Sequence, residues 1–205
     1  MNEIDLRELI AAAAALQKKW EAMDFQFCFI GGLAVQHWGE PRQTNDVDAT
    51  VWTQFGNERP VIDRLLEDLT SCIENADQFA LVNRVLLVQE PSGVDVDVAL
   101  AAFPYELEMI RRAEKQPFRD EQLLICGPSD LIILKAFANR ARDWQDIRGI
   151  MIRSGSQLDW RLIESELEVL ANLKEEPEIL DRLHNLQSEL STKNQELRTS
   201  LHALP

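Results

Sequence analysis

Apolar and polar positions in the first half of the chain follow helical periodicity in some segments and strand periodicity in others. Apolar residues recur at three- and four-residue steps from Glu3 to about Met23, which predicts an amphipathic helix. The aromatic segment Phe25–Ile30 ends at two glycines and predicts a short buried strand, and Asp46–Thr53 alternates like a second strand. Three more helices are expected around these strands, at residues 33–38, 60–73 and 76–83.

The centre of the chain has the pattern of a β-hairpin. Val85–Gln89 and Val94–Ala99 are rich in β-branched residues and flank the turn Pro91-Ser92-Gly93. A helix is expected over Phe103–Lys115 and a last strand over Gln122–Cys126. Because every later segment has helical periodicity, the pattern predicts an α+β fold in which a short mixed sheet is flanked by helices.

The C-terminal part reads as a separate helical extension. A break that contains Gly155 precedes two further helices, so we expect one domain over residues 1–154 and an extension over 155–205. Leucines recur at three- and four-residue steps after Pro177. They predict packing of the last helix on the preceding one, with self-association as the alternative, so we expect a monomer or a weak homodimer through these helices.

Composition narrows the class of protein. The 205 residues include 35 Asp+Glu and 21 Lys+Arg, a formal charge of −14, which argues against a protein that coats duplex nucleic acid. The acidity is uneven, since residues 1–100 contain 17 acids and 7 bases, whereas residues 101–154 contain 8 acids and 9 bases. A small basic surface that binds phosphates would therefore have to lie within residues 101–154.

The sequence contains no visible signal for export or membrane insertion. No apolar run approaches the roughly 20 residues that cross a bilayer, and no basic and apolar leader precedes the first helix. The three cysteines are far apart and predict neither a disulfide framework nor a zinc site. We therefore expect a cytoplasmic protein that has no membrane partner.

Two glycines and two pairs of aspartates are the candidate chemistry. A strand that ends in Gly31-Gly32 and runs into a helix exposes backbone amides that can bind a phosphate, although such a pair is often only a turn. Asp46 and Asp48 lie two positions apart on a predicted strand, so their carboxylates share one face. They also fit a solvated strand edge, but like charges this close favour a cation between them.

The predicted hairpin supplies a third carboxylate. Asp95 and Asp97 share one face of its second strand, opposite a stripe of valines, and either could complete the site. We favour Asp97, because it lies deeper in the apolar run, where an unpaired carboxylate is costly. Three converging aspartates with phosphate oxygens suit Mg²⁺ (or Mn²⁺), so the pattern indicates metal-assisted phosphoryl or nucleotidyl transfer.

These residues resemble a known family. The motifs that carry the resemblance are Gly31-Gly32, Arg42-x-Thr44-x-Asp46-Val47-Asp48 and Val96-Asp97-Val98. They look like the nucleotidyltransferase fold of the DNA polymerase β superfamily. The later segment, with Lys135, Arg140, Asp143 and Asp146, is similar to the lysine and Arg-x-x-Asp helices of the AbiEii-type branch, which occurs in bacterial toxin–antitoxin and phage-defence systems.

The resemblance implies a role for each matched position. Gly31 and Gly32 would hold the triphosphate of an NTP, together with Arg42 and Thr44. Asp46, Asp48 and Asp97 would bind Mg²⁺, and Asp97 would also help to activate the attacking hydroxyl. Lys135 would complete the catalytic set by contacting triphosphate oxygens.

Some readings stay open at the level of sequence. Without the upstream motifs, Lys135 would be read as a lysine that extends to solvent, and Asp143 and Asp146 as capping residues that pair with nearby arginines. We expect transfer of a nucleoside monophosphate to a hydroxyl of RNA (a tRNA end), a protein or a small molecule, with a cognate antitoxin as a possible partner. The alternative is a non-catalytic nucleotide- or partner-binding module on the same fold.

Overall fold

A computed structural model describes residues 5–202, and for residues 194–202 it describes the backbone alone. The chain divides into two compact units. The first comprises residues up to His37 and Pro41–Gly127, and the second comprises Trp38–Glu40 and the chain from Pro128 onward. Across the described residues, none of the helices combines the length and the hydropathy needed to cross a membrane.

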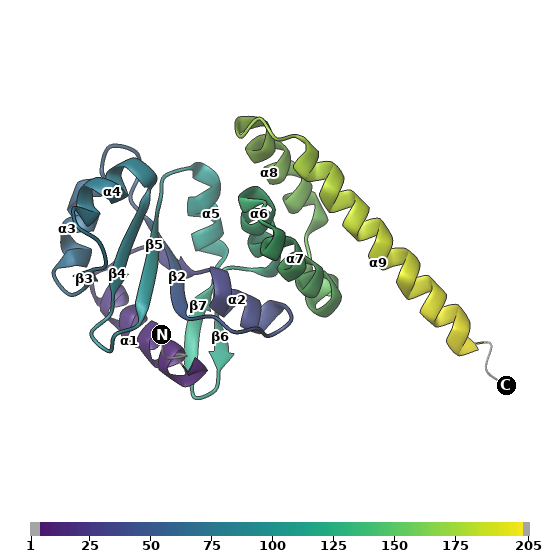
Figure 1. Ribbon diagram of the computed structural model, residues 1–205, viewed down its shortest axis with the longest axis horizontal. Helices are drawn as coiled ribbons and strands as arrows, with labels where there is room; N and C mark the ends of the chain where they lie inside the picture. The colour runs from purple at the N-terminus through teal and green to yellow at the C-terminus, as the bar shows by residue number, and fades with distance from the viewer. Residues whose placement is uncertain (1–4, 203–205) are drawn as a thin grey trace. The chain divides into compact units, whose positions relative to one another are not determined.

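The first unit is built on a mixed sheet in the order β3-β4-β5-β2-β1-β7-β6. Figure 1 labels the strands of this sheet except β1. Two neighbouring pairs are parallel, β2 with β5 and β1 with β7, and the other pairs are antiparallel. The strands are β1 (Phe27–Phe29), β2 (Asp46–Trp52), β3 (Thr70–Ser71), β4 (Val85–Gln89), β5 (Asp95–Ala101), β6 (Glu114–Phe118) and β7 (Glu121–Ile125). The expected α+β fold with a mixed sheet and flanking helices is confirmed.

Five helices belong to this unit, of which α2 ends in the residue where the second unit begins. They are α1 (Leu6–Ala22), α2 (Gly31–Trp38), α3 (Glu58–Leu66), α4 (Ala76–Asn83) and α5 (Pro104–Arg112). Helix α1 begins at a capping box, in which Asp5 accepts from a backbone amide while Glu8 accepts from the backbone of Asp5. Its buried face packs on β7 and β2, and Gln17 makes side-chain hydrogen bonds to the backbone of β7.

Two helices are shorter in the structure than the sequence pattern predicts, and a strand that was not expected follows each of them. The helix expected over Pro60–Ile73 ends at Leu66, because Thr70 and Ser71 pair with β4 at the edge of the sheet. The helix expected over Phe103–Lys115 ends at Arg112, and the next residues form β6. Proline cannot continue a helix and is tolerated on an edge strand, so Pro117 fits β6, which is the last strand of the sheet.

The second unit is helical, as the sequence predicts for the C-terminal part. Its helices are α6 (Pro128–Ala138), α7 (Ala141–Ser154), the 3₁₀ turn η1 (Gly155–Gln157), α8 (Trp160–Leu173) and α9 (Glu178–His202). Helix α6 packs on α7 and α8, and the buried residues of the unit come from all four α-helices. Ile179 and Leu183 bury the start of α9.

The compact units do not divide where the sequence breaks. Contacts separate the chain at Gly127, because α6 and α7 pack with α8 and α9, whereas the expected boundary lies at residues 154–156. The division into a nucleotidyltransferase domain over residues 1–154 and an extension over 155–205 therefore stays a prediction. The leucine pattern after Pro177 is described in part, since the side chains of Leu197 and Leu201, and all of Leu204, lie outside the described residues. The homodimer remains a prediction.

Candidate active site

Parallel pairing of β2 with β5 brings three carboxylates together. Asp46 lies opposite Asp95, and Asp48 lies opposite Asp97, in the register of the two strands. Carboxylate oxygens of Asp46, Asp48 and Asp97 all lie within 4.8 Å of one another. The period of two along each strand places these groups on one face, while Val47, Ala49, Val96 and Val98 are buried on the other.

Asp95 lies beside this cluster without belonging to it. Its side chain is exposed and accepts a hydrogen bond of 3.0 Å from Nε2 of Gln89, and the Cys72 thiol lies 3.9 Å from its carboxylate. Burial raises the pKa of Cys72, and the charges of Asp95 and Asp97 raise it further, so the thiol stays protonated. Among the described residues, the acids placed closely enough to hold a metal ion together are therefore Asp46, Asp48 and Asp97, without Asp95.

The environment of Asp97 opposes its negative charge. Desolvation is the first cause of its raised pKa, and the neighbouring charges of Asp46 and Asp95 add to it. A half-buried carboxylate beside two others is unfavourable unless a cation joins them, so the three oxygens fit a small divalent ion such as Mg²⁺. The donor set is all oxygen, which excludes the softer sites that thiols and imidazoles make.

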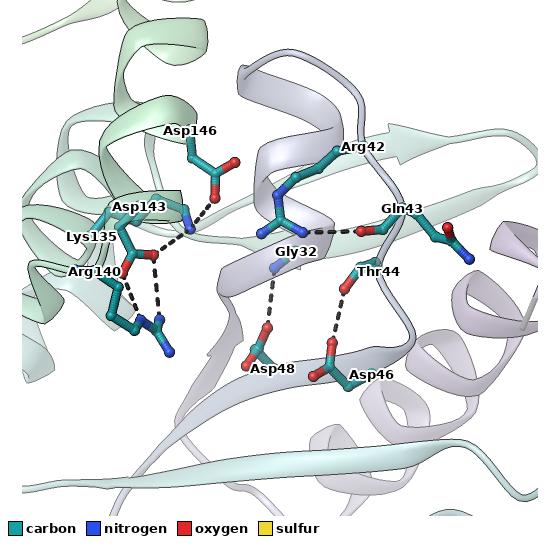
Figure 2. A network of polar contacts seen from close by, with 10 residues as sticks. All are labelled: Gly32, Arg42, Gln43, Thr44, Asp46, Asp48, Lys135, Arg140, Asp143 and Asp146. Carbon is teal, nitrogen blue, oxygen red and sulfur yellow. Dashed lines mark hydrogen bonds and ion pairs between the residues drawn. The ribbon is translucent and has the colours of Figure 1, made fainter. Parts of the chain in front are cut away.

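The start of α2 explains why both glycines are needed. Gly31 has a φ of +53°, and a Cβ there would lie 1.8 Å from Oδ2 of Asp48. The backbone N–H of Gly32 donates a hydrogen bond of 3.1 Å to the same oxygen (Figure 2). The resemblance implies that these amides hold a triphosphate, whereas in the structure the Gly32 amide donates to the carboxylate of Asp48.

The loop before β2 connects to the same carboxylates. Thr44 is buried, and its hydroxyl donates a hydrogen bond of 2.8 Å to Oδ1 of Asp46. Gln36 of α2 donates a hydrogen bond to the Arg42 carbonyl. The Arg42 guanidinium donates to the carbonyl of Gln43 at 3.1 Å, as Figure 2 shows. The structure thus brings the matched glycines, Arg42 and Thr44 into one neighbourhood within the first unit.

Lys135 lies in the second unit in a buried ion cluster. Its ammonium is 2.6 Å from Asp146 and 3.2 Å from Asp143, and all three side chains are less than 10% exposed (Figure 2). Lys135 therefore does not extend to solvent. Asp143 also accepts from the side chain and the backbone of Arg140 at the start of α7, which confirms the capping and pairing role that its spacing predicts.

Thr50 lies on the same strand face as the aspartates, and no sequence motif identified it. Thr50 follows Asp48 by two positions on β2 and is 1% exposed, and its hydroxyl has no hydrogen-bond partner among the described residues. Strand periodicity places it on the same face as the two aspartates, so the alternation of β2 was the signal that could have found it. A buried hydroxyl without a partner is rare and usually has a reason.

The fold and the face of carboxylates define a class of protein, the nucleotidyltransferases. The sequence matches, over residues 5–193, the model of a family described as "Nucleotidyltransferase of unknown function (DUF6036)". The chain belongs to this family. A search of curated proteins finds no relative of the chain.

Solved structures share the fold at low sequence identity. An antigenic nucleotidyltransferase-like protein from Paracoccidioides brasiliensis superposes with a TM-score of 0.51 and 14% identity, covering 98% of this chain and 94% of its own. The antibiotic-resistance factor ANT(2'')-Ia gives a TM-score of 0.50 and 14% identity over 86% of this chain and 96% of its own. At these identities the likeness shows the fold, and the expected polymerase-β-like architecture agrees with it.

Proposed function

We propose that the protein is a Mg²⁺-dependent nucleotidyltransferase that moves a nucleoside monophosphate from an NTP to an acceptor hydroxyl. The observation that carries the proposal is the convergence of Asp46, Asp48 and Asp97 within 4.8 Å on one sheet face. Membership of a nucleotidyltransferase family supports the same reaction class. In this reaction the acceptor oxygen forms a bond to the α-phosphorus, the bond from that phosphorus to the bridging oxygen breaks, and pyrophosphate leaves.

The metal would be held by the three carboxylates. Asp46 and Asp48 come from one strand and Asp97 from its parallel neighbour, so the sheet itself fixes their spacing. Bound there, Mg²⁺ (or Mn²⁺) would offset the negative charge of the triphosphate and of the aspartates. An anionic nucleotide would therefore approach the three carboxylates only after a cation has bound to them.

Asp97 is proposed to accept the proton of the attacking hydroxyl. The resemblance implies this role, and the position of Asp97 on the same sheet face as Asp46 and Asp48 supports it, because an acceptor hydroxyl beside the metal would also lie beside this carboxylate. The proton of the acceptor would move to Asp97 as the new bond to phosphorus forms.

The triphosphate is proposed to lie at the start of α2. The backbone N–H groups of Gly31 and Gly32 at the start of α2 are the proposed donors to phosphate oxygens, and Arg42 supplies a cation in the loop that follows α2. The Gly32 amide would then exchange its bond with Asp48 for a bond with a phosphate oxygen. Lys135 is the further proposed cation for the triphosphate, which would have to compete with Asp143 and Asp146 for its ammonium.

Calorimetry of nucleotide binding tests the proposal without knowledge of the acceptor. Each of the four NTPs is titrated into the protein with Mg²⁺ and with EDTA, and binding of at least one NTP that depends on Mg²⁺ is expected. The Asp46→Asn/Asp48→Asn variant should lose this binding, while Glu67→Gln, which changes an exposed carboxylate on the first unit, should keep it. No binding by the wild type, or equal binding by the aspartate variant, would contradict the proposal.

Transfer of label separates the enzyme from a non-catalytic binding module. The protein is incubated with α-labelled NTPs and three acceptor classes, namely tRNA, lysate protein and hydroxylated small molecules. An enzyme transfers label to one class, and Asp97→Asn abolishes the transfer. Nucleotide binding without transfer to any class would favour the binding module. The narrower placement in the AbiEii-type branch, with toxin activity and a cognate antitoxin, predicts label on a cellular RNA or protein.

A further inference from the structure

Thr44 and Gly32 occupy one small volume beside the acidic cluster. A Cβ placed on Gly32 would lie 2.2 Å from Oγ1 of Thr44 and 2.7 Å from its Cβ, far closer than real contacts. The Thr44 side chain therefore fills the space that a side chain at position 32 would need. Both residues belong to the first unit, so this fit is a property of that unit alone.

The hydroxyl of Thr44 has a defined use in this position. It donates to Oδ1 of Asp46 at 2.8 Å, and only 8% of the residue is exposed. The hydrogen bond commits one oxygen of Asp46 and fixes the plane of its carboxylate, which leaves the other oxygen for a cation. Partners that orient a ligand in this way usually change metal affinity 10- to 100-fold when removed.

The backbone on both sides of Thr44 is held as well. Gln36 of α2 donates to the carbonyl of Arg42, which ties the loop to the helix that begins at the two glycines. On the other side, β2 starts at Asp46 and pairs with β5 along its whole length. The Thr44 side chain is thus fixed between a helix and a strand, as an orienting group must be.

We propose that Thr44 is a positioning residue that fixes the metal-binding carboxylate of Asp46, and that residue 32 is glycine in order to admit the Thr44 side chain. This inference rests on the proposed function, because it gives Thr44 its purpose at the metal site. Thr44 acts through Asp46, whereas the sequence places it among the groups that hold the nucleotide. Each glycine leaves space for one side chain. Gly31 leaves space for Asp48 on β2, and Gly32 leaves space for Thr44 in the loop before β2.

Binding of Mn²⁺ measured by electron paramagnetic resonance tests the role of the hydroxyl. Thr44→Val keeps the shape of the side chain and removes the donor, while Thr44→Ser keeps the donor. We expect Thr44→Val to weaken Mn²⁺ binding by about 10-fold or more, and Thr44→Ser to stay within about threefold of the wild type. Thermal unfolding in EDTA shows whether both variants fold, and it should change little for either.

The outcomes divide cleanly. Equal Mn²⁺ affinity of Thr44→Val and the wild type overturns the inference while leaving the proposed function intact. Equal losses in Thr44→Val and Thr44→Ser also overturn it, because a role in packing rather than donation would then explain the loss. Absence of Mn²⁺ binding by the wild type contradicts the proposed function and the inference together.

An exchange of the two residues tests the shared volume. Gly32→Ser alone should clash with Thr44 and weaken Mn²⁺ binding, and Thr44→Gly alone should lose the hydroxyl. The double variant Gly32→Ser/Thr44→Gly removes the overlap and returns a hydroxyl to the same space, so it should bind Mn²⁺ at least threefold more tightly than Gly32→Ser. A double variant no better than either single variant would contradict the assignment of Gly32 to Thr44.

Discussion

At the scale of one residue, the charge of Asp97 lowers the stability of the folded, metal-free protein. Its pKa is raised by burial and by the charges of Asp46 and Asp95, so the folded protein binds this proton more tightly than the unfolded chain. The free energy of unfolding therefore falls as the pH rises through the interval between the unfolded and the folded pKa. Above the folded pKa the metal-free protein carries the full cost of this charge.

We expect Asp97→Asn to stabilise the metal-free protein at pH 7 while abolishing nucleotidyl transfer. The gain should be about 2–4 °C in Tm, the shift that about 1 kcal/mol gives for a protein of this size. It should vanish below the ordinary pKa of aspartate, where the carboxyl is protonated in both states. Thermal scans in EDTA from pH 3 to 8 measure it, and Glu67→Gln controls for the loss of an exposed charge. A Tm that falls at pH 7 would contradict the prediction.

Thr50 allows a second test of single residues. Replacing its partnerless hydroxyl by a methyl group in Thr50→Val should raise the free energy of unfolding by about 1–2 kcal/mol, because a buried donor without a partner costs about this much. Thr53→Val is the matched control, since the buried Thr53 donates 3.0 Å to the Ala101 carbonyl. The control should lose about 1 kcal/mol in urea denaturation. Equal signs for the two changes would contradict this reading.

At the scale of elements, the start of α2 depends on one backbone conformation. Gly31→Ala places a Cβ in the left-handed region and against Asp48, so it should lower the free energy of unfolding by at least about 1–3 kcal/mol. Gly155→Ala is the control, because that glycine has a helical φ of −55° and no atom would lie within 4 Å of an added Cβ. The control should be neutral or slightly stabilising in denaturant titrations. Tolerance of alanine at Gly31 would show that the loop can relax.

The lysine cluster fixes α6 to α7 within the second unit. Lys135→Met would remove the ammonium that the buried Asp143 and Asp146 share, although Arg140 still pairs with Asp143, so we expect a loss of about 3–5 kcal/mol in the free energy of unfolding. Lys115→Met removes an exposed ion pair with Glu21 and should cost less than about 1 kcal/mol. If Lys135→Met instead kept full stability and only raised the KM for NTP, the lysine would serve the nucleotide alone.

The sequence allows the face of a strand to be predicted better than the partner of a side chain. The period of two in β2 and β5 places Asp46, Asp48 and Asp97 correctly, because a strand has no other way to bury its valines. Strands β3 and β6 were missed because they are short or polar edge strands that need a neighbour to form. The pairing of Thr44 with Asp46, and the burial of Lys135, depend on loops and helix packing, which have no signature in local periodicity.

At the scale of the whole molecule, family and fold both indicate a nucleotidyltransferase. The net charge of the chain bears on how a nucleotide would bind. The formal charge of −14 includes the aspartates on the sheet face, which would repel the proposed nucleotide until a cation neutralises them. The protein is therefore expected to depend on a divalent cation for nucleotide affinity as well as for chemistry. Its acidity is compatible with a transferase that contacts one nucleotide and excludes a coat for duplex DNA.

In the hydrogen bond from Gly32 to Asp48, the carboxylate occupies the amide that is proposed to bind a phosphate. A phosphate that binds at this helix start, as proposed, would have to displace Asp48, and a cation bound by Asp48 would free the Gly32 amide. Cation and nucleotide should then each increase the affinity of the other by the same factor, as linkage requires. Titrating NTP at several Mg²⁺ concentrations, with Asp48→Ala as the variant whose helix start is permanently open, measures this coupling. Inorganic pyrophosphate in EDTA should bind Asp48→Ala more tightly than the wild type.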